Sequence, residues 1–565
     1  MFKHCYSVCL ATLILVSSGA QGASPAATQS ERGMVTSRSE LASRAGVELL
    51  AAGGNAIDAA VATGFALAVT YPSAGNLGGG GFALVRLASG EVLSLDHREK
   101  APASAHRDMF IDAAGNIIKN QSRSTHRAAG VPGSVDGLLT LLEKYGSKSR
   151  QQVMAPAIEL ASQGFILNRD LAGQFNTVAK KMSLYPGSMA VFTDNGKDYQ
   201  SGDLFVQADL AKTLQAISAS GREGFYSGEV AGLIVAEMAR GNGEITLQDL
   251  ADYRSVWRQP VKSSYRGHTI WGMAAPSSGG VLIAQMLNMF EPFDVKKMGW
   301  GSAELIHLMV EGERRAYADR AEHLGDPDFV DVPMAKLIDK DYAGSRFADF
   351  DKNKATDSKA VGAGSWPAES TETTHYSVAD GEGNLVSLTT TINSGYGNKI
   401  VVQGAGFLLN NEMNDFSLKE NTRNQFNLIG RSANAIAPGK RMLSSMSPTI
   451  VTKDGQPLLV TGSPGGSTII TTVLQVVMNV IDHGMDISEA VSLPRFHHQW
   501  MPNQVFYGGQ GITPDTKKIL ESMGHKKIQL MRWGRGIGDA NSIAIKDGVL
   551  HGIDDPRTEG AAIGL

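Results

Sequence analysis

The chain has 565 residues, 42% of them hydrophobic and 19% charged, which is enough for a large buried core and for more than one domain. With a formal net charge of −4, the composition gives no indication of a nucleic-acid partner or of an anionic membrane surface. The two cysteines, Cys5 and Cys9, both lie near the N-terminus, so the rest of the chain has no cysteine nucleophile, disulfide or cysteine metal ligand.

The first residues have the layout of an export signal. Lys3 and His4 precede an apolar run over residues 5–16, and small residues follow through Ala23. This pattern predicts a secretory signal peptide over residues 1–22 and therefore a periplasmic or secreted protein, the alternative being a buried N-terminal helix. The run is too short to span a bilayer comfortably, and no later stretch is long and uncharged enough, so we expect no membrane span.

The N-terminal half is predicted to be mainly helical. Residues 39–70 have a helical pattern broken at 53–55, and the second part is apolar on nearly all sides, which predicts a buried helix. Strands are expected at 82–87 and 92–96, after a glycine-rich loop. From about 133 to 350 the chain again reads mostly helical, with 305–320 as an amphipathic helix.

A polar stretch separates this half from a strand-rich one. Residues 351–370 lack periodicity and predict a mobile surface linker. Two hairpins follow, with strands at 374–379 and 385–392 and then at 447–452 and 457–461. A glycine loop leads into an apolar helix at 467–482. Helices on both sides of antiparallel strands predict an α+β sandwich with the sheets inside and the helices outside.

The first hairpin places two hydroxyl groups opposite each other. If its loop centres on Glu382, then Ala379 faces Leu385 and Thr373 faces Thr391 at the open end, beside the linker. Threonine is also common in strands for reasons of packing alone, so the pattern by itself does not establish a site.

A threonine next to a linker becomes an N-terminal residue if the preceding peptide bond is cut. An N-terminal threonine carries a hydroxyl nucleophile and an α-amine, whose unperturbed pKa of about 7.7–8.0 suits a general base. The pattern does not choose between Thr373 and Thr374. The glycines at 465 and 466, between a strand and a helix, could supply backbone N–H donors to an oxyanion, or could simply make a turn.

Several motifs occur in an order that spans most of the chain. They are Gly53-Gly54-Asn55-Ala56-Ile57-Asp58-Ala59-Ala60, Gly78–Phe82, Arg98-Glu99-Lys100-Ala101-Pro102, Thr373-Thr374-His375-Tyr376-Ser377, Leu409-Asn410-Asn411-Glu412-Met413-Asn414-Asp415-Phe416, Ser444-Ser445-Met446-Ser447-Pro448-Thr449, Gly462-Ser463-Pro464-Gly465-Gly466 and Asp555-Pro556-Arg557. This series resembles the γ-glutamyltransferase family, also called glutathione hydrolases, among the N-terminal-nucleophile hydrolases.

The resemblance implies a four-layer αββα sandwich and a precursor that cleaves itself. The bond cut would be Glu372–Thr373, which gives a large subunit over residues 23–372 and a small subunit over 373–565, both sharing one sandwich. It also selects Thr373 over Thr374 as the nucleophile.

The resemblance further implies the chemistry. Thr373 would attack the γ-carbonyl of glutathione or a related γ-glutamyl amide, and the resulting ester would pass to water, an amino acid or a dipeptide. Gly465 and Gly466 would form the oxyanion hole, and Thr391 would orient the nucleophile. No metal or cofactor is expected, and His497-His498 is not spaced like a pair of metal ligands.

Six further residues match the family's donor pocket. Arg98, Ser444 and Ser445 would bind the α-carboxylate of the donor. Asp415 would bind the α-ammonium group, with Glu412 and Asn393 as its neighbours. Residues 418–429 correspond to a lid in many bacterial members, with Phe426 where those often carry an aromatic hydroxyl or an indole.

Two alternatives differ from this function. A cephalosporin acylase-like member would remove glutaryl-type groups that lack the α-ammonium, so Asp415, Ser444 and Ser445 favour a γ-glutamyl donor. A non-enzymatic periplasmic binding protein would need neither a chain break nor Thr373.

Overall fold

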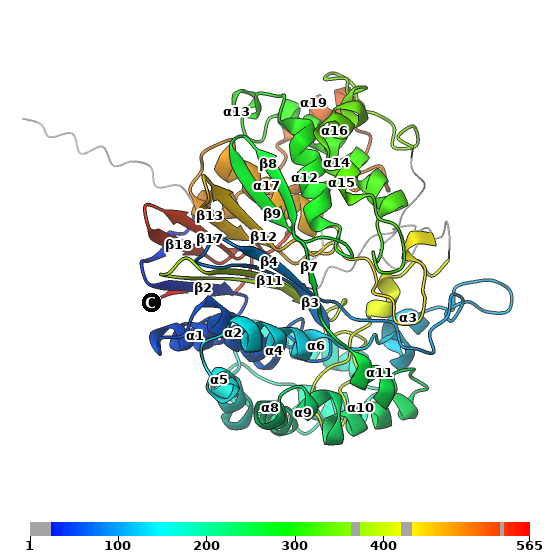
Figure 1. The fold of residues 1–565 in the computed structure, drawn as a ribbon. Coiled ribbons are helices and arrows are strands. Elements are labelled where there is room, and N and C mark those ends of the chain that lie inside the picture. Colours follow the sequence, from blue (N-terminus) through cyan, green and yellow to red (C-terminus); the bar gives the residue numbers. More distant parts are fainter. Residues whose placement is uncertain (1–23, 363–372, 420–431, 532–535) are drawn as a thin grey trace, which may run out of the picture.

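Two facing β-sheets form the centre of the molecule, and helices cover both outer faces (Figure 1). The computed structural model describes residues 24–362, 373–419, 432–531 and 536–565. The first sheet has the order β19 (Ala561–Gly564), β2 (Gly33–Ser37), β10 (Thr373–Asp380), β11 (Leu385–Thr391), β3 (Gly80–Arg86), β4 (Val92–His97) and β7 (Val256–Arg258). The second has the order β1 (Thr28–Ser30), β18 (Val549–Ile553), β17 (Ser542–Lys546), β13 (Gln456–Thr461), β12 (Thr449–Lys453), β9 (His268–Gly272) and β8 (Val261–Tyr265).

The two sheets are joined by a layer of apolar side chains. Strands of both contribute to it: Met34, Leu84, Ala379 and Leu385 from the first sheet, and Ile450, Val460, Ile543 and Leu550 from the second. All strand pairs within both sheets are antiparallel. The predicted four-layer αββα sandwich is confirmed.

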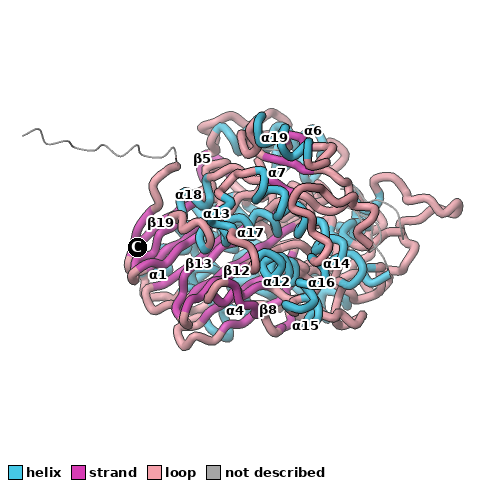
Figure 2. Tube along the Cα trace, turned by 90° about the horizontal axis from the view of Figure 1, so that it is seen from above, coloured by secondary structure: helices cyan, strands magenta, loops and turns pink. Residues whose placement is uncertain are grey.

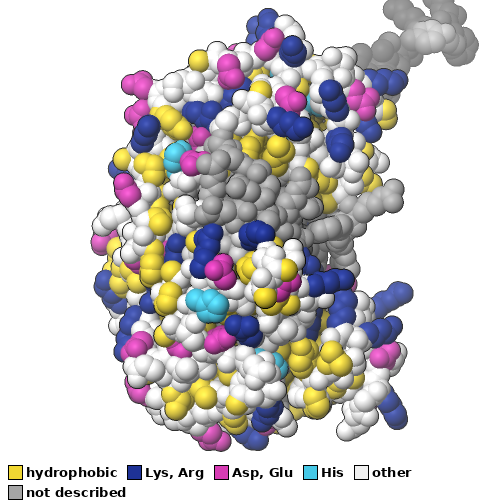
Figure 3. Space-filling model, turned by 90° about the vertical axis from the view of Figure 1, so that its right-hand side faces the viewer, with side chains coloured by type: hydrophobic (Ala, Val, Ile, Leu, Met, Phe, Trp, Pro, Cys, Tyr) yellow, Lys and Arg dark blue, Asp and Glu magenta, His cyan; other side chains and the backbone are white. Residues whose placement is uncertain are grey.

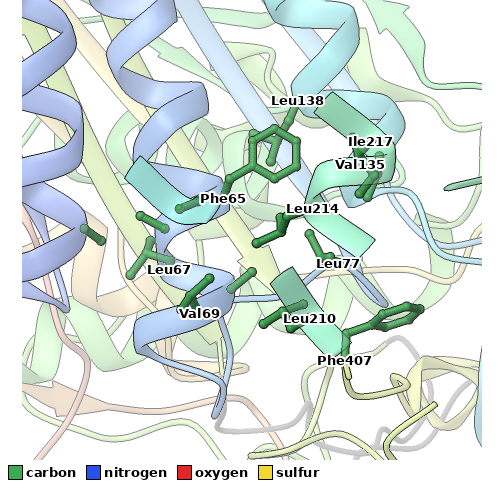
Figure 4. Close-up of a cluster of buried hydrophobic side chains, with 14 of the residues drawn as sticks. Phe65, Leu67, Val69, Leu77, Val135, Leu138, Leu210, Leu214, Ile217 and Phe407 are labelled. Carbon is green, nitrogen blue, oxygen red and sulfur yellow. The ribbon is translucent and has the colours of Figure 1, made fainter. Parts of the chain in front are cut away.

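The lower helical layer in Figure 1 packs on the first sheet. Its helices are α1 (Glu40–Ala51), α2 (Ala56–Thr70), α4 (Ser134–Tyr145), α5 (Arg150–Gln163), α6 (Arg169–Met182), α7 (Pro186–Phe192), α8 (Ala208–Ser220), α9 (Glu223–Tyr226), α10 (Gly228–Arg240) and α11 (Leu247–Asp252). Every residue of α2 is buried, as its sequence predicts, because strands β10 and β11 lie on one side of it and α4 and α5 on the other. Figure 4 shows Phe65 and Leu67 of α2 within this core.

The helix α2 begins where the sequence indicates a break. Asn55 accepts hydrogen bonds from the backbone N–H groups of Ile57 and Asp58, and the Asp58 carboxylate accepts one from the N–H of Asn55. This reciprocal cap satisfies N–H groups that otherwise have no partner at a helix start.

The upper helical layer covers the second sheet, and Figure 2 shows it from above. Helix α12 packs on β8 and β9 and against α14 and α17. The layer comprises α12 (Gly279–Phe290), α13 (Val295–Met298), α14 (Ala303–His323), α15 (Met334–Leu337), α16 (Lys340–Phe347), α17 (Thr468–Ile481), α18 (Ile487–Ser492) and α19 (Pro514–Ser522). Smaller elements are α3 (Gln121–Ser124), the strands β5 (Phe165–Ile166), β6 (Leu204–Phe205), β14 (Phe496–His497), β15 (Val505–Tyr507) and β16 (Ile528–Leu530), and three 3₁₀ turns, His126–Ala128, Glu412–Asp415 and Ser432–Asn434.

Of two sequence predictions for the middle of the chain, the amphipathic helix was wrong, and the mostly helical character holds. Helix α14 is not amphipathic in the sense predicted, because residues 305–321 are all buried, charged ones included. Its charges are satisfied inside the protein: both Arg314 and Arg315 pair with Glu311, and Arg346 pairs with Asp319. The region predicted as mostly helical also contains the strands β7, β8 and β9.

The segment that follows α16 is predicted to be a mobile linker, but its described part is anchored. Residues 351–362 contain no helix or strand, yet the indole N–H of Trp500 donates to the carbonyl of Ser358 at 2.6 Å, and the N–H of Ala355 donates to Met523 at 2.7 Å. Residues 363–372, and with them Glu372, lie outside the described residues. So do the predicted signal peptide and Phe426. Within the described parts of the chain, no helix has the length and apolar character needed to cross a membrane.

Candidate active site

The predicted pair of threonines forms at the end of the first sheet. Thr373 is the first residue of β10 and lies opposite Thr391, the last residue of β11, in the predicted register. The Thr373 hydroxyl donates to the Thr391 Oγ1 at 3.5 Å, and both side chains are buried. Thr391 Oγ1 also accepts from the backbone N–H of Asn393 at 2.8 Å. Thr391 is therefore held in place beside Thr373.

The nearby histidine of the same strand is occupied by other partners. His375 Nδ1 lies 2.9 Å from Thr389 Oγ1, and its Nε2 lies 3.0 Å from Ser377 Oγ. Burial lowers the pKa of His375 to about 3, so the ring is neutral. Both ring nitrogens are thus occupied within the hairpin, and this side chain is not placed to act as a base for Thr373.

The glycine loop after β13 packs against the same strand. A Cβ atom added to Gly462 would lie 2.4 Å from the His375 ring, so only glycine allows this approach. Gly465 and Gly466 have φ angles of 130° and 60°, which L side chains rarely adopt. Neither of their N–H groups donates a hydrogen bond to a described residue. Two backbone donors are thus available just before the N-terminus of α17.

The predicted donor-binding residues gather around one buried arginine. Arg98 directly follows β4 and is 1% exposed. Its Nη2 donates to the Asp415 carboxylate at 2.6 Å, and its Nη1 lies 2.9 Å from Glu412 Oε1 and 3.3 Å from Glu99 Oε2. One cation therefore faces three buried carboxylates.

Burial changes the protonation of two of these acids. It raises the pKa of Glu412 to about 8, with the neighbouring Glu99 raising it further and Arg98 opposing the rise. It raises the pKa of Glu99 to about 7, again against the effect of Arg98. Both carboxyl groups therefore titrate close to neutral pH, and the cluster has capacity for a further positive charge.

The two predicted serines lie next to this arginine. Arg98 donates to the backbone carbonyls of Met442 and Leu443, at 3.3 and 3.5 Å, immediately before Ser444. Ser444 Oγ accepts from the N–H of Met446 at 3.1 Å, and Ser445 Oγ accepts from Arg320 at 3.2 Å.

Asn393 closes the cluster from the side of the threonines. It has a left-handed φ of 70° and donates from its side chain to the carbonyl of Asn411, next to Glu412, at 2.8 Å. The structure thus brings together all the described residues predicted for the donor pocket.

Strand order fixes the distance between the two parts of the site. Thr391 pairs with Gly80 of β3, and the next residue, Gly81, pairs with His97 of β4. Arg98 is thus two strands from Thr391 at the same sheet end, or about 10 Å between backbones. Figure 3 looks onto this right-hand side of Figure 1, where Lys and Arg side chains surround the middle of the face.

Glu99 is the residue that the sequence interpretation missed. It appears in the motif with Arg98 but received no role. Gly80 makes room for it, because a Cβ there would lie 2.6 Å from Glu99 Oε2. Its position beside Arg98 in sequence was the available signal.

The histidines predicted not to bind metal are engaged in hydrogen bonds. His497 contacts Thr471 and Gln499 at 2.9 Å each. Elsewhere in the described chain, His307, Glu311 and His525 place ligand-type atoms within 4.8 Å of one another. Here His307 and His525 share a hydrogen bond of 2.8 Å, and Glu311 is paired with two arginines, so these contacts account for the cluster.

The chain is similar to known proteins over most of its length. The sequence profile of the Gamma-glutamyltranspeptidase family matches residues 42–565. A glutathione hydrolase proenzyme of Escherichia coli (strain K12) is 48% identical over 533 residues, which are 94% of this chain and 91% of that protein. A cephalosporin acylase structure from Bacillus halodurans matches with a TM-score of 0.84 and 28% identity, over 98% of this chain and 99% of that chain. A γ-glutamyltranspeptidase structure from Helicobacter pylori has 48% identity and a TM-score of 0.57, over 57% of this chain and 93% of that chain.

Proposed function

The chain belongs to the γ-glutamyltranspeptidase family, and from this premise we propose that Thr373 is the nucleophile that carries the γ-glutamyl group. The protein is a glutathione hydrolase and γ-glutamyltransferase of the N-terminal-nucleophile type, made as a precursor that is cleaved into subunits. The observation that carries the assignment to Thr373 is its hydroxyl contact with Thr391 at the start of β10.

Maturation begins with an attack within the chain. The Thr373 hydroxyl attacks the carbonyl carbon of Glu372, and the acyl group moves from nitrogen to oxygen. Water then hydrolyses this ester, which releases the carboxylate of Glu372 and the α-amine of Thr373. The products are a large subunit ending at Glu372 and a small subunit over residues 373–565, which remain together because β10 is in the middle of the first sheet.

In turnover the new α-amine serves as general base. It takes the proton of the Thr373 hydroxyl as Oγ attacks the γ-carbonyl of the donor, and it returns that proton to the departing amine. The N–H groups of Gly465 and Gly466 stabilise the oxyanion; loss of one such donor typically lowers the rate about 10²–10³-fold. Water or an acceptor amine then cleaves the γ-glutamyl ester.

The cluster around Arg98 supplies recognition of the donor's two charged groups. Arg98, Ser444 and Ser445 bind the α-carboxylate, while Asp415 and Glu412 bind the α-ammonium and Asn393 positions them. In the described structure, Arg98 and Asp415 pair with each other. A bound donor would place its carboxylate at Arg98 and its ammonium at Asp415.

The basic test is the release of chromophore from a γ-glutamyl anilide, with and without a dipeptide acceptor. The purified protein is expected to hydrolyse the anilide and to turn it over faster when the dipeptide is present, with formation of a γ-glutamyl dipeptide. A protein that separates into two fragments but releases no chromophore would contradict the assignment.

The pKa of Glu412 gives a second expected result. An ionised Glu412 attracts the donor ammonium, and burial raises the pKa of Glu412 to about 8, so the donor KM should rise as pH falls from 8.5 to 6. In Glu412→Gln the side chain is neutral at every pH, so its KM should exceed that of the parent at pH 8.5 and converge with it at pH 6. Steady-state kinetics with separate KM and kcat profiles test this, and parallel KM profiles would contradict it.

We also propose that residues 1–22 are a signal peptide that directs the protein to the periplasm or the medium. Fractionation of cells, with N-terminal sequencing of the large subunit, tests this directly. A large subunit that still begins at Met1 would contradict the proposal.

The similarity to a cephalosporin acylase supports one second candidate, hydrolysis of glutaryl amides. A glutaryl donor has no ammonium group for Asp415 and Glu412 to bind. A γ-glutamyl donor has one and is therefore the favoured substrate. A γ-glutamyl anilide and a glutaryl anilide assayed side by side distinguish the two.

A further inference from the structure

A cavity opens at the same end of the first sheet as the candidate active site. It has a volume of about 780 Å³, within the usual range for small-molecule sites. Its lining includes Arg38, Tyr71, Arg169, Lys181, Ser394 and Glu559. We call it the α6 cleft, because one face of α6 forms a wall of it.

The α6 cleft lies on the opposite side of Thr373 from Arg98. Arg38 directly follows β2, and β2 is the neighbour of β10 on the side away from β11. The strand order at this sheet end therefore runs from the cleft, through Thr373 and Thr391, to the donor pocket at the end of β4. Neighbouring strands are about 4.8 Å apart, so the cleft begins one strand spacing from the nucleophile's strand.

Short chains of contacts connect the cleft with the catalytic residues. Ser394 follows Asn393, whose N–H binds Thr391. On the other wall, the Thr558 hydroxyl donates to Asp539 at 3.0 Å, and the N–H of Asp539 donates to Ser463 at 2.9 Å, two residues before Gly465. The same Asp539 pairs with Arg38 at 3.4 Å.

The charge of the cleft is opposite to that of the donor pocket. Four cations, Arg38, Arg169, Lys181 and Lys399, line it together with two acids, Asp170 and Glu559. Gln174 donates to Asp170 at 2.9 Å, Asn168 donates to Glu559 at 3.0 Å, and Arg38 pairs with Asp539. The donor pocket, in contrast, has three acidic side chains around one arginine. A site with this excess of cations favours an anionic group.

We propose that the α6 cleft binds the carboxylate end of the acceptor and of the leaving group, which are amino acids or short peptides with a free C-terminus. This proposal rests on the function proposed above and extends it to the second substrate. A dipeptide with its amine at the ester on Thr373 extends about 7 Å, which is more than the spacing of about 4.8 Å to the neighbouring strand β2, after which Arg38 lies.

The transfer step balances without any additional reactant. The acceptor's neutral amine attacks the ester carbonyl, a C–N bond forms, and the C–O bond to Thr373 Oγ breaks. One proton passes from the attacking nitrogen, through the α-amine of Thr373, to Oγ. The acceptor carboxylate takes no part in these bonds, so the cleft contributes to binding and orientation only.

Helix α6 offers a matched pair of lysines for the test. Lys181 lines the cleft, whereas the adjacent Lys180 does not, and both are exposed on the same helix. The variants are Lys181→Ala, Arg169→Ala, the double variant, and Lys180→Ala as control. Each is assayed for transfer from a γ-glutamyl anilide to glycylglycine and to glycylglycinamide, which has no carboxylate.

The expected readout is the ratio of the two acceptor KM values. The KM for glycylglycine should rise about 3–10-fold in each single variant and more in the double variant, while that for glycylglycinamide stays within about twofold. Added salt should raise the glycylglycine KM in the parent and less in the double variant. The control Lys180→Ala should match the parent in both.

Two failures are distinguishable. If the double variant keeps the parental KM ratio, the α6 cleft does not bind the carboxylate and the proposal is overturned. If the unsubstituted enzyme does not hydrolyse the anilide at all, the proposed function itself fails, before any acceptor is added.

Discussion

Replacing Thr373 with alanine is expected to leave the chain as a single polypeptide and to abolish turnover. The substitution removes the hydroxyl that attacks Glu372, so no new N-terminus forms and the general base is lost together with the nucleophile. Removal of a nucleophile of this kind lowers turnover by at least about 10⁴-fold. A denaturing gel shows the precursor directly, and anilide hydrolysis measures the activity.

The adjacent threonine provides the matched control. Thr374 is also buried, but its hydroxyl has no hydrogen-bond partner in the described chain, so Thr374→Ala should cleave and turn over like the parent. Thr373→Ser keeps a hydroxyl and should still be cut. The small subunit of the parent should begin with Thr-Thr-His-Tyr-Ser. A cleaved, active Thr373→Ala protein would refute the assignment.

The hairpin β10–β11 shows what local pattern can determine. Its alternating side chains and its short loop between Asp380 and Leu385 allow one register, because a slip of one residue would turn every side chain to the other face. The predicted opposition of Thr373 and Thr391 follows from that register alone. The choice of Thr373 over Thr374 did not follow from it and needed the family resemblance.

Helix α14 shows where local pattern fails. A helix with Glu311, Arg314, Arg315 and Asp319 predicts a solvent-facing side, yet these charges lie between α12, α16 and the segment after α16. Some of their partners are distant in sequence, as when the N–H of Thr356 donates to Glu311. Other partners come from the same helix. Tertiary contacts determine whether charged side chains are buried in ion pairs, and the periodicity of the sequence does not predict this.

The donor pocket was predictable as a set of residues but not as an electrostatic arrangement. Arg98 lies 317 positions before Asp415 in sequence, and only the strand order brings them to 2.6 Å. The raised pKa values of Glu99 and Glu412 also depend on complete burial, which no motif encodes. The same holds for the α6 cleft, whose walls come from α6, the end of β2 and the residues before β19.

The substitution Asp415→Asn should weaken the binding of the donor's ammonium group and leave the interactions of its carbonyl group unchanged. Asparagine keeps the shape and one acceptor oxygen for Arg98, but it removes the negative charge that an ammonium needs. A buried charge pair of this kind contributes a factor of about 10²–10³, so kcat/KM for a γ-glutamyl anilide should fall by that amount.

The donor without the ammonium supplies the control within one protein. For a glutaryl anilide, which lacks that group, Asp415→Asn should change kcat/KM by no more than about threefold, since no pair between Asp415 and a donor ammonium is lost. Self-cleavage should also proceed, because it involves Thr373 and Glu372 and no free donor. Equal losses on both anilides would mean that Asp415 supports the fold of the pocket, whereas a selective loss on the γ-glutamyl anilide locates the ammonium at this carboxylate.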